Sequence, residues 1–242
     1  MNKVINKNLY KIINLITIII FVALSFYSFK YAKKTDEYTI NKIIITGNEF
    51  RKNEFINKII QNDINNKNIF NIDISSVNNK IIKDDYIESA KIFTIFPSTL
   101  SIIINEINPI ALFQKNGKYT LIDKNNDQIT ANLKSINHYS VPIISINESN
   151  NNDIDKTVNT LKYIVRKNNE LYNSIDEIII EKEFSYFIIN NTKIKLNKNN
   201  IDKDVFKLIQ FINDTKDSND INKYKYVNVT VPNQIIVKER KM

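Results

Sequence analysis

A long apolar stretch near the N-terminus constrains this chain more than any other feature. No charged residue occurs between Lys11 and Lys30, and residues 12–29 read IINLITIIIFVALSFYSF. As an α-helix this stretch would be roughly 27 Å long at about 1.5 Å per residue, close to the bilayer hydrocarbon thickness of about 30 Å. The sequence therefore predicts a short tail (1–11), one membrane-spanning helix (12–29), a linker (30–37) and a large polar remainder.

Two other interpretations of this stretch stay open at this point. A signal peptide has an apolar region of about 7–15 residues that ends at small residues, and Ala23-Leu24-Ser25 is an acceptable cleavage site. A buried core helix would normally keep a polar face, whereas here only scattered Asn, Thr and Ser occur. The positive-inside rule does not decide the orientation, because lysines flank both ends of the stretch equally. These lysines are Lys3, Lys7, Lys11, Lys30, Lys33 and Lys34.

The composition excludes several kinds of chemistry. The 242 residues include no Cys and a single His, His138. Disulfides, thiolate catalysis and Cys-based metal sites are therefore excluded, and a Ser-His triad or a metal site would depend on His138 alone. The net charge of +8 comes from lysines spread along the whole chain, which is typical of a solvated surface rather than of a nucleic-acid-binding stripe.

No other residues converge on a reactive centre. The acidic pairs Asp84-Asp85 and Glu181/Glu183 lie in charged segments, where we expect exposure and no pKa tuning for acid–base catalysis. The Gly residues are isolated, so no phosphate-binding loop is predicted. The sequence predicts no catalytic residue, no cofactor, no metal and no small-molecule substrate. The alternative left open is a membrane-anchored or secreted cell-envelope enzyme, such as a cell-wall hydrolase, with an unusual site.

The residues after the linker predict a compact α+β unit over residues 38–107. A β-branched run at 38–46 reads as a strand that ends at Gly47-Asn48. Two helices follow, capped by Asn53 and by Asp73, and then strands at 89–96 and 100–107. Apolar periodicity predicts a core at seven positions. They are Ile44, Phe55, Ile59, Val77, Ile81, Ile92 and Ile102.

Residues 108–240 predict a second domain that is β-rich but mixed, so the fold class is α+β. Alternating apolar runs between turn residues indicate the strands, and apolar residues at helical spacing indicate the helices. The predicted strands are 111–113, 119–122, 128–129, 142–145, 177–180, 186–190, 193–196, 226–231 and 234–238. The predicted helices are 155–170 and 202–213.

Motifs in this order resemble the FtsQ (DivIB) family of bacterial cell-division proteins. Residues 43–48 (IIITGN) are similar to the opening of the family's POTRA domain, a small β-α-α-β-β module, and residues 68–73 (NIFNID) to its middle loop. Residues 92–110 are the most specific match, with an aromatic-Pro turn, a strand and the run NEINP. Residues 119–123 resemble the start of the family's second domain, and residues 226–232 its last strand pair.

Three residues depart from the family pattern. Ile107 stands where the family usually has an arginine, and Asn228 and Thr230 replace an acid and a base in the last strand pair. Contacts that the family residues make at these positions are not expected to carry over.

The resemblance implies a scaffold of the division machinery without enzymatic activity. It places the N-terminus in the cytoplasm and the domains in the periplasm, as a single-pass type II protein of the inner membrane at the division septum. The implied partners are FtsB and FtsL, with other divisome members, and no nucleic acid. Another POTRA-containing envelope assembly protein is the alternative within the binding class.

The C-terminal strand pair is the predicted partner contact. An exposed sheet edge offers unpaired backbone N–H and C=O groups that a partner strand can bind. Pro232 cannot donate a ladder hydrogen bond, so residues 234–237 are the expected pairing edge. The resemblance assigns the contact to Thr230, Val231, Asn233, Ile235 and Val237. The alternative is a closing strand covered by the second domain itself.

Overall fold

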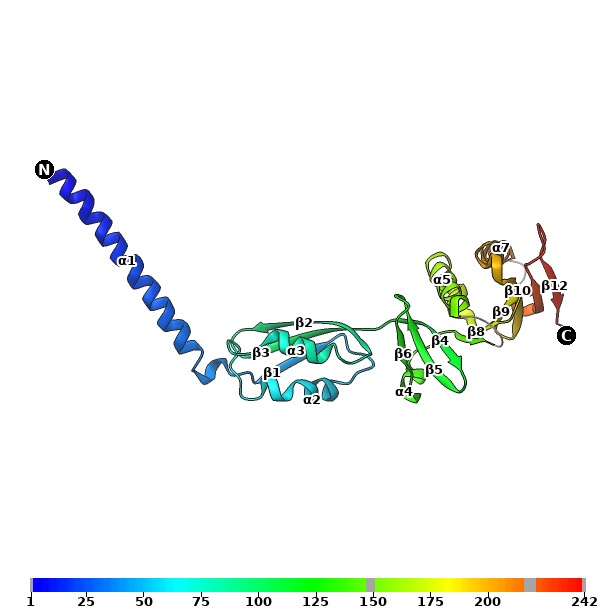
Figure 1. The fold of residues 1–242 in the computed structure, drawn as a ribbon, viewed down its shortest axis with the longest axis horizontal. Coiled ribbons are helices and arrows are strands. Elements are labelled where there is room, and N and C mark those ends of the chain that lie inside the picture. The colour runs from blue at the N-terminus through cyan, green and yellow to red at the C-terminus, as the bar shows by residue number, and fades with distance from the viewer. Residues whose placement is uncertain (1, 147–150, 216–220, 241–242) are drawn as a thin grey trace. The chain divides into compact units, whose positions relative to one another are not determined.

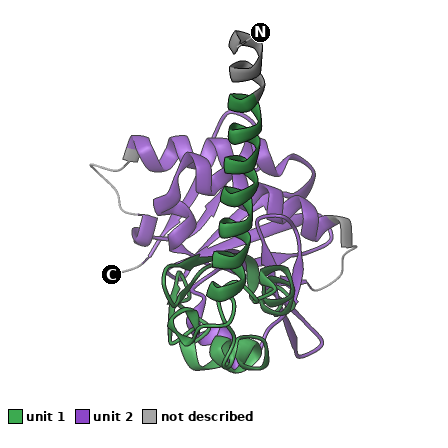
Figure 2. Ribbon diagram, turned by 90° about the vertical axis from the view of Figure 1, so that its left-hand side faces the viewer, with its two compact units in different colours: residues 1–106 green, residues 107–242 purple. Residues whose placement is uncertain are grey.

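The computed structural model describes residues 2–146, 151–215 and 221–240 (Figure 1). The chain divides into two compact units, residues 1–106 and residues 107–242 (Figure 2). Elements of both kinds alternate along the chain, and the second unit is rich in strands. The predicted α+β class is therefore confirmed.

The first unit begins with α1 (Asn2–Ala32), a continuous helix that contains the predicted span. Residues Leu9–Ala32 form the one helical segment in the described residues that is long and apolar enough to cross a membrane, and none of its most apolar window is buried. That exposure contradicts the core-helix interpretation. The helix extends beyond residues 12–29 at both ends, so the predicted linker is helical as far as Ala32 and continues through the short 3-10 turn η1 (Asp36–Tyr38).

A three-stranded sheet with two helices on one face follows. Strands β1 (Lys42–Thr46), β2 (Ile87–Ile95) and β3 (Thr99–Glu106) lie in the order β1-β3-β2. β1 is parallel to β3, and β2 is antiparallel to it. Helices α2 (Asn53–Ile64) and α3 (Ile74–Ile81) connect β1 to β2, in the predicted order. Asp73 caps α3 as predicted, accepting a hydrogen bond from the Ser76 backbone N–H at 3.0 Å. Asn53 does not cap α2, because it is already the first helical residue.

The core of this unit uses positions of α2 that lie next to the two predicted ones. Ile56, Ile60 and Ile64, one helical turn apart, are the buried residues. Phe55 is 37% exposed, so its assignment to the core was wrong, and Ile59 packs only at the core margin.

The strands supply the other side of this core. Val77, Ile81 and Ile102 are buried as predicted, and Ile92 packs at the margin. Ile44 was predicted wrongly, because Ile43 and Ile45 pack on the core while side chains alternate along a strand. Ile44 therefore lies on the sheet face away from the helices.

The second unit contains one mixed sheet of nine strands within the described residues, in the order β12-β11-β10-β9-β8-β7-β4-β5-β6. The strands are β4 (Pro109–Lys115), β5 (Lys118–Asp123), β6 (Gln128–Thr130), β7 (Ile143–Ile146), β8 (Ile175–Ile180), β9 (Phe184–Ile189), β10 (Thr192–Asn197), β11 (Tyr224–Asn228) and β12 (Ile236–Glu239). The helices are α4 (Leu133–His138), α5 (Asn151–Lys167), α6 (Asn169–Ser174) and α7 (Ile201–Thr215), with the 3-10 turns η2 (Lys198–Asn200) and η3 (Ile221–Lys223).

Each predicted strand of this unit is present with shifted ends, but two short helices were missed. α4 begins at a capping box, in which the Asn132 side chain accepts from the Ser135 backbone N–H and the Ser135 hydroxyl accepts from the Asn132 N–H. The Asn-x-x-Ser spacing was a readable signal for this helix. α6 is separate from α5 because Asn168 starts a new helix, its side chain accepting from the Leu171 N–H at 2.9 Å.

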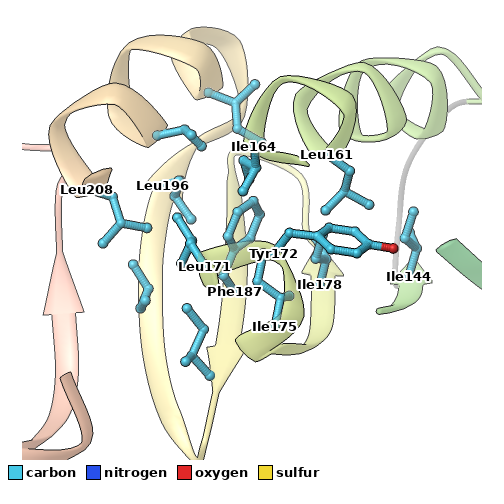
Figure 3. Packing of buried hydrophobic residues seen from close by; sticks show 14 of the residues in the cluster. Ile144, Leu161, Ile164, Leu171, Tyr172, Ile175, Ile178, Phe187, Leu196 and Leu208 are labelled. Atoms are coloured by element: carbon cyan, nitrogen blue, oxygen red, sulfur yellow. The ribbon is translucent and has the colours of Figure 1, made fainter. Parts of the chain in front are cut away.

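The core of the second unit lies between this sheet and its helices. Figure 3 shows side chains of α5, α6 and α7 packed against strands β7 to β10. Fully buried members include Ile144, Leu161, Ile164, Ile178, Phe187, Leu196 and Leu208. The Tyr172 hydroxyl lies among them and donates to the Ile110 carbonyl oxygen at 3.1 Å. Burial raises the pKa of Tyr172 to about 12.

Candidate partner-binding edge at β12

Strand β12 lies at one end of the nine-stranded sheet. Its one strand neighbour in the described part of the chain is β11, which pairs antiparallel with Val237 opposite Val227 and Ile236 opposite Asn228. All four residues of β12 are exposed. The outer side of β12 can therefore offer backbone N–H and C=O groups to another strand.

The connection into β12 is a defined turn. β11 ends at Asn228, earlier than predicted, and the Asn228 side-chain oxygen accepts from the Thr230 N–H at 3.0 Å and from its hydroxyl at 2.7 Å. Such Asx turns stop a strand locally. Asn228 and Thr230, which depart from the family pattern, therefore bond to each other. Asn233 follows Pro232 with a φ of 59°, a left-handed conformation that Asn tolerates.

A lysine of α7 also binds the connection between β11 and β12. Lys207 Nζ donates to the carbonyl oxygens of Val229 and Val231, the latter at 3.2 Å, and pairs with Asp204 at 3.4 Å. Val229 is fully buried. The backbone that leads into β12 is thus tied to the core, and β12 begins after it.

The predicted contact residues fall into different environments. Thr230 and Val231 are half-buried in the connection, and Asn233 is exposed at its turn. Ile235 packs against the main core cluster, whereas Val237 lies in β12 and is exposed. Of the five, the structure places Val237 alone within the edge strand.

Strand β12 begins and ends two residues later than the expected edge 234–237, so the prediction missed its last two residues. Ile236 is 49% exposed, and Lys238 and Glu239 complete the strand. The run Ile235, Ile236, Val237 contains no polar residue that would mark the exposed face of the strand. The sequence therefore could not separate the core side chain from the exposed ones. Charged residues at the end of an edge strand oppose unspecific pairing with other edges.

The acidic residues considered for catalysis serve the fold or lie at the surface. Asp84 accepts two hydrogen bonds from the Arg51 guanidinium, at 2.9 and 2.7 Å, and both side chains are largely buried. The expectation that Asp84 is solvated was therefore wrong, whereas Asp85 and Glu183 are exposed and Glu181 is half-buried. Within residues 2–146, 151–215 and 221–240, no group of three or more His, Cys, Asp and Glu side chains is placed to hold a metal ion.

Residues 38–106 match the family model of the POTRA domain, FtsQ-type. That stretch is the sheet and the two helices of the first unit, with the short turn before them. The first unit carries an FtsQ-type POTRA domain.

A curated relative agrees with this match. The cell division protein FtsQ of Koribacter versatilis is 27% identical over 105 residues, which are 43% of this chain and 30% of that protein. The chain thus spans less than a third of the length of this relative. Together with the POTRA match, it confirms the resemblance to FtsQ drawn from the sequence. Among solved structures, the major extracytoplasmic domain of the cell division protein DivIB from Geobacillus stearothermophilus aligns with a TM-score of 0.34 and 10% identity, over 48% of this chain and 99% of that one.

The motifs that carry the resemblance hold one loop of the POTRA domain. Gly47 has a φ of 79°, and a Cβ atom there would collide with the Ile104 carbonyl oxygen. The Glu106 carboxylate accepts hydrogen bonds from the backbone N–H groups of residues 49, 50 and 51, at 3.0, 2.8 and 2.7 Å. Gly47 and Glu106 therefore fix the turn from β1 into α2. Ile107, in place of the family's arginine, is buried.

Proposed function

We propose that this chain is a non-enzymatic scaffold of the bacterial division machinery, anchored by α1 in the inner membrane at the division septum with the POTRA domain and the second unit outside the cytoplasm. The observation that carries the proposal is an FtsQ-type POTRA domain directly after a helix long enough to span a membrane. The curated relative supports it, because that protein is a cell division protein.

The orientation can be tested with reporters fused to the C-terminus of the full chain. A reporter that works only outside the cytoplasm is expected to be active, and one that works only in the cytoplasm is expected to be silent. The mass of the membrane-bound protein should include residues 1–25. An N-terminus near Phe26 would instead mean a cleaved signal peptide and would overturn the anchor.

We further propose that β12 binds FtsB, in complex with FtsL, by strand addition. The support is an edge strand with no outer neighbour among the described residues, and an exposed apolar side chain at Ile236. A partner strand would gain backbone hydrogen bonds along β12, while its side chains would meet Ile236 and Val237. The connection tied to Lys207 would keep this edge preformed.

Proline substitutions test the edge directly. Amides of successive strand residues point to opposite sides, so one of Ile236→Pro and Val237→Pro removes an outward N–H and the other removes one that faces β11. We expect the outward variant to lose FtsB binding with an unchanged circular dichroism spectrum. Ile235→Pro is less suitable, because Ile235 packs against the core.

The opposite edge of the same sheet supplies the control. Gln128→Pro at the first position of β6 should leave FtsB binding unchanged, since proline is tolerated at the first residue of a strand. Normal FtsB binding by both β12 variants would exclude the β12 edge as the docking site. The full chain is also expected to show no turnover of cell-wall substrates, which would distinguish it from a cell-envelope hydrolase.

A further inference from the structure

Four aromatic side chains gather at the point where α1 meets the POTRA domain. The Phe70 ring is central, with centroid distances of 5.5 Å to Phe29, 5.3 Å to Tyr38 and 5.5 Å to Phe96. Tyr38 and Phe96 also meet at 6.5 Å. We call Phe29, Tyr38, Phe70 and Phe96 the aromatic cluster. Its members come from four separate segments: α1, η1, the loop before α3 and the β2–β3 turn.

Hydrogen bonds hold the loop that carries Phe70 against the end of α1. The buried Asn68 side chain donates to the carbonyl oxygens of Ala32 at 2.8 Å and Thr35 at 3.1 Å. The Asn71 side chain donates to the Lys33 carbonyl oxygen at 3.2 Å. The last carbonyls of a helix have no partner within it, so these amides complete the end of α1.

The β2–β3 turn is joined to the same region. The Ser98 hydroxyl donates to the Asn41 side-chain oxygen at 2.9 Å, and the Asn41 N–H donates to the Ser98 carbonyl oxygen at 3.1 Å. Phe96, at the tip of this turn, is therefore held near the start of the domain.

The aromatic cluster leaves much apolar surface uncovered. Phe96 is 62% exposed and Phe29 is 50% exposed, and the neighbouring Ile95 is exposed as well. Lys33 Nζ lies 4.7 Å from the centroid of the Phe29 ring, and Lys30 and Lys34 flank the same helix end. Exposed apolar side chains beside lysines, at the last turn of an apolar helix, are typical of protein surfaces that enter the boundary between lipid headgroups and acyl chains.

We infer that the aromatic cluster docks into the headgroup region of the lipid bilayer, beside the point where α1 leaves it. The inference rests on the proposed membrane anchor. Phe29 closes the apolar run 12–29, and Phe70 touches Phe29 while Phe96 touches Phe70, so the tip of the β2–β3 turn lies within two ring contacts of the residue at which the apolar run ends. Lys30, Lys33 and Lys34 would meet anionic lipid phosphates at that level. The POTRA domain is then held on the membrane surface by lipid contacts in addition to its covalent link.

The chain contains no Trp, so a single substitution creates a specific fluorescent probe. We would reconstitute the full chain in vesicles of phosphatidylcholine with a minority of phosphatidylglycerol, and quench with phosphatidylcholine brominated near the top or near the end of its acyl chains. In these vesicles, Phe96→Trp is expected to emit at a shorter wavelength than the control Phe206→Trp, an exposed position on α7. The shallow bromines are expected to quench most of the Phe96→Trp fluorescence.

Two further variants separate the possible failures. Phe21→Trp, in the apolar run, should be quenched by the deep bromines, and its lack of quenching would overturn the membrane anchor and the inference together. Phe55→Trp, on α2 beside Arg51, follows the end of β1 opposite to the Asn41–Ser98 contact and should resemble Phe206→Trp. If Phe21→Trp is quenched while Phe96→Trp resembles Phe55→Trp, the anchor stands and the lipid contact is excluded. Tyr38→Trp, which should be quenched like Phe96→Trp, repeats the test if the turn does not tolerate the larger ring.

Discussion

The two sheets of this protein differ in what covers the face that their helices leave open. In the POTRA domain that face carries Ile44, Phe93, Ile95 and Ile103, and the last three are exposed. In the second unit the corresponding face carries lysines over aromatic rings, with Lys193 Nζ 3.8 Å from the Tyr186 centroid and Lys195 Nζ 3.4 Å from that of Phe184. Long basic side chains cover apolar surface while keeping their charge in water.

Alternation along a strand decides which side chains share a face of the sheet. It does not decide what lies against that face. Both sheets follow period two, and both open faces carry lysines, since Lys91 lies opposite Ile103 in the POTRA sheet. In the second sheet the lysines lie directly over aromatic rings. The open face of the POTRA domain stays apolar near the β2–β3 turn, the end that we assign to the membrane. Both units also have glycine turns and acids that accept backbone hydrogen bonds, which makes matched substitutions possible.

Glycine substitutions should give the largest difference between the units. Gly47 and Gly117 both have positive φ, 79° and 73°, but a Cβ atom collides with backbone only at Gly47. Gly117→Ala is expected to cost about 1–2 kcal/mol from the left-handed backbone alone. Gly47→Ala adds the collision and should exceed about 4 kcal/mol. Segment-resolved hydrogen exchange on the full chain would measure both, and equal costs would contradict the close approach to Ile104.

Core truncations should affect the units separately. Ile60→Ala in the POTRA domain and Leu161→Ala in the second unit each remove a fully buried side chain and are expected to cost about 2–5 kcal/mol. Hydrogen exchange should speed up only in the unit that carries the change. Ile59→Ala, at the core margin, is the control and should cost clearly less. An Ile59→Ala cost equal to that of Ile60→Ala would mean that the buried face of α2 is assigned wrongly.

Neutralising one hydrogen-bonded acid in each unit should give a moderate effect. Glu106 accepts from three backbone N–H groups, and Asp123, itself buried, accepts from those of Asn125 at 2.7 Å and Asp127 at 2.8 Å. Glu106→Gln and Asp123→Asn keep the shape but lose the charge, for an expected cost of about 1–3 kcal/mol each. Denaturant unfolding would compare them, with Glu183→Gln at an exposed position as the control. No loss in Glu106→Gln would mean that the loop does not depend on this carboxylate.

Alkaline pH should lower the stability of the second unit, with the smallest effect among these predictions. The pKa of Tyr172 is raised by burial from 10.0 to about 12. Above pH 10 the unfolded chain releases this proton while the folded chain keeps it, so the unfolded state binds fewer protons and stability falls as pH rises toward 12. The expected loss is up to about 2 kcal/mol.

A Tyr172→Phe variant is the control for this pH effect. It should start from a lower stability, because it lacks the hydrogen bond to Ile110, but fall less steeply between pH 10 and 12. Burial also raises the pKa of Tyr186 and Tyr226, so a shallower slope of the same sign should remain. An identical slope in wild type and Tyr172→Phe would contradict the assignment.

The element order and several turns could be predicted because their signals are local. The apolar run, the Asp73 cap and the Pro232-Asn233 turn each depend on a few neighbouring residues, and the structure has each of them. The edge strand could be predicted only in part. Val237 lies in the edge strand, but Ile235 and Ile236 are chemically alike, and sequence does not show which one packs on the core.

By itself, the sequence determined the apolar N-terminal helix, the α+β order and the resemblance to FtsQ, because periodicity, caps and turn residues depend on residues close together in the chain. Tertiary structure decided which face of α2 is buried, where β12 lies in the sheet, and that Phe29, Tyr38, Phe70 and Phe96 meet. Adjacent apolar positions such as Phe55 and Ile56 fit a core equally well by pattern. The choice between them depends on which segments, distant in sequence, pack against α2. The packing of the whole unit decides this.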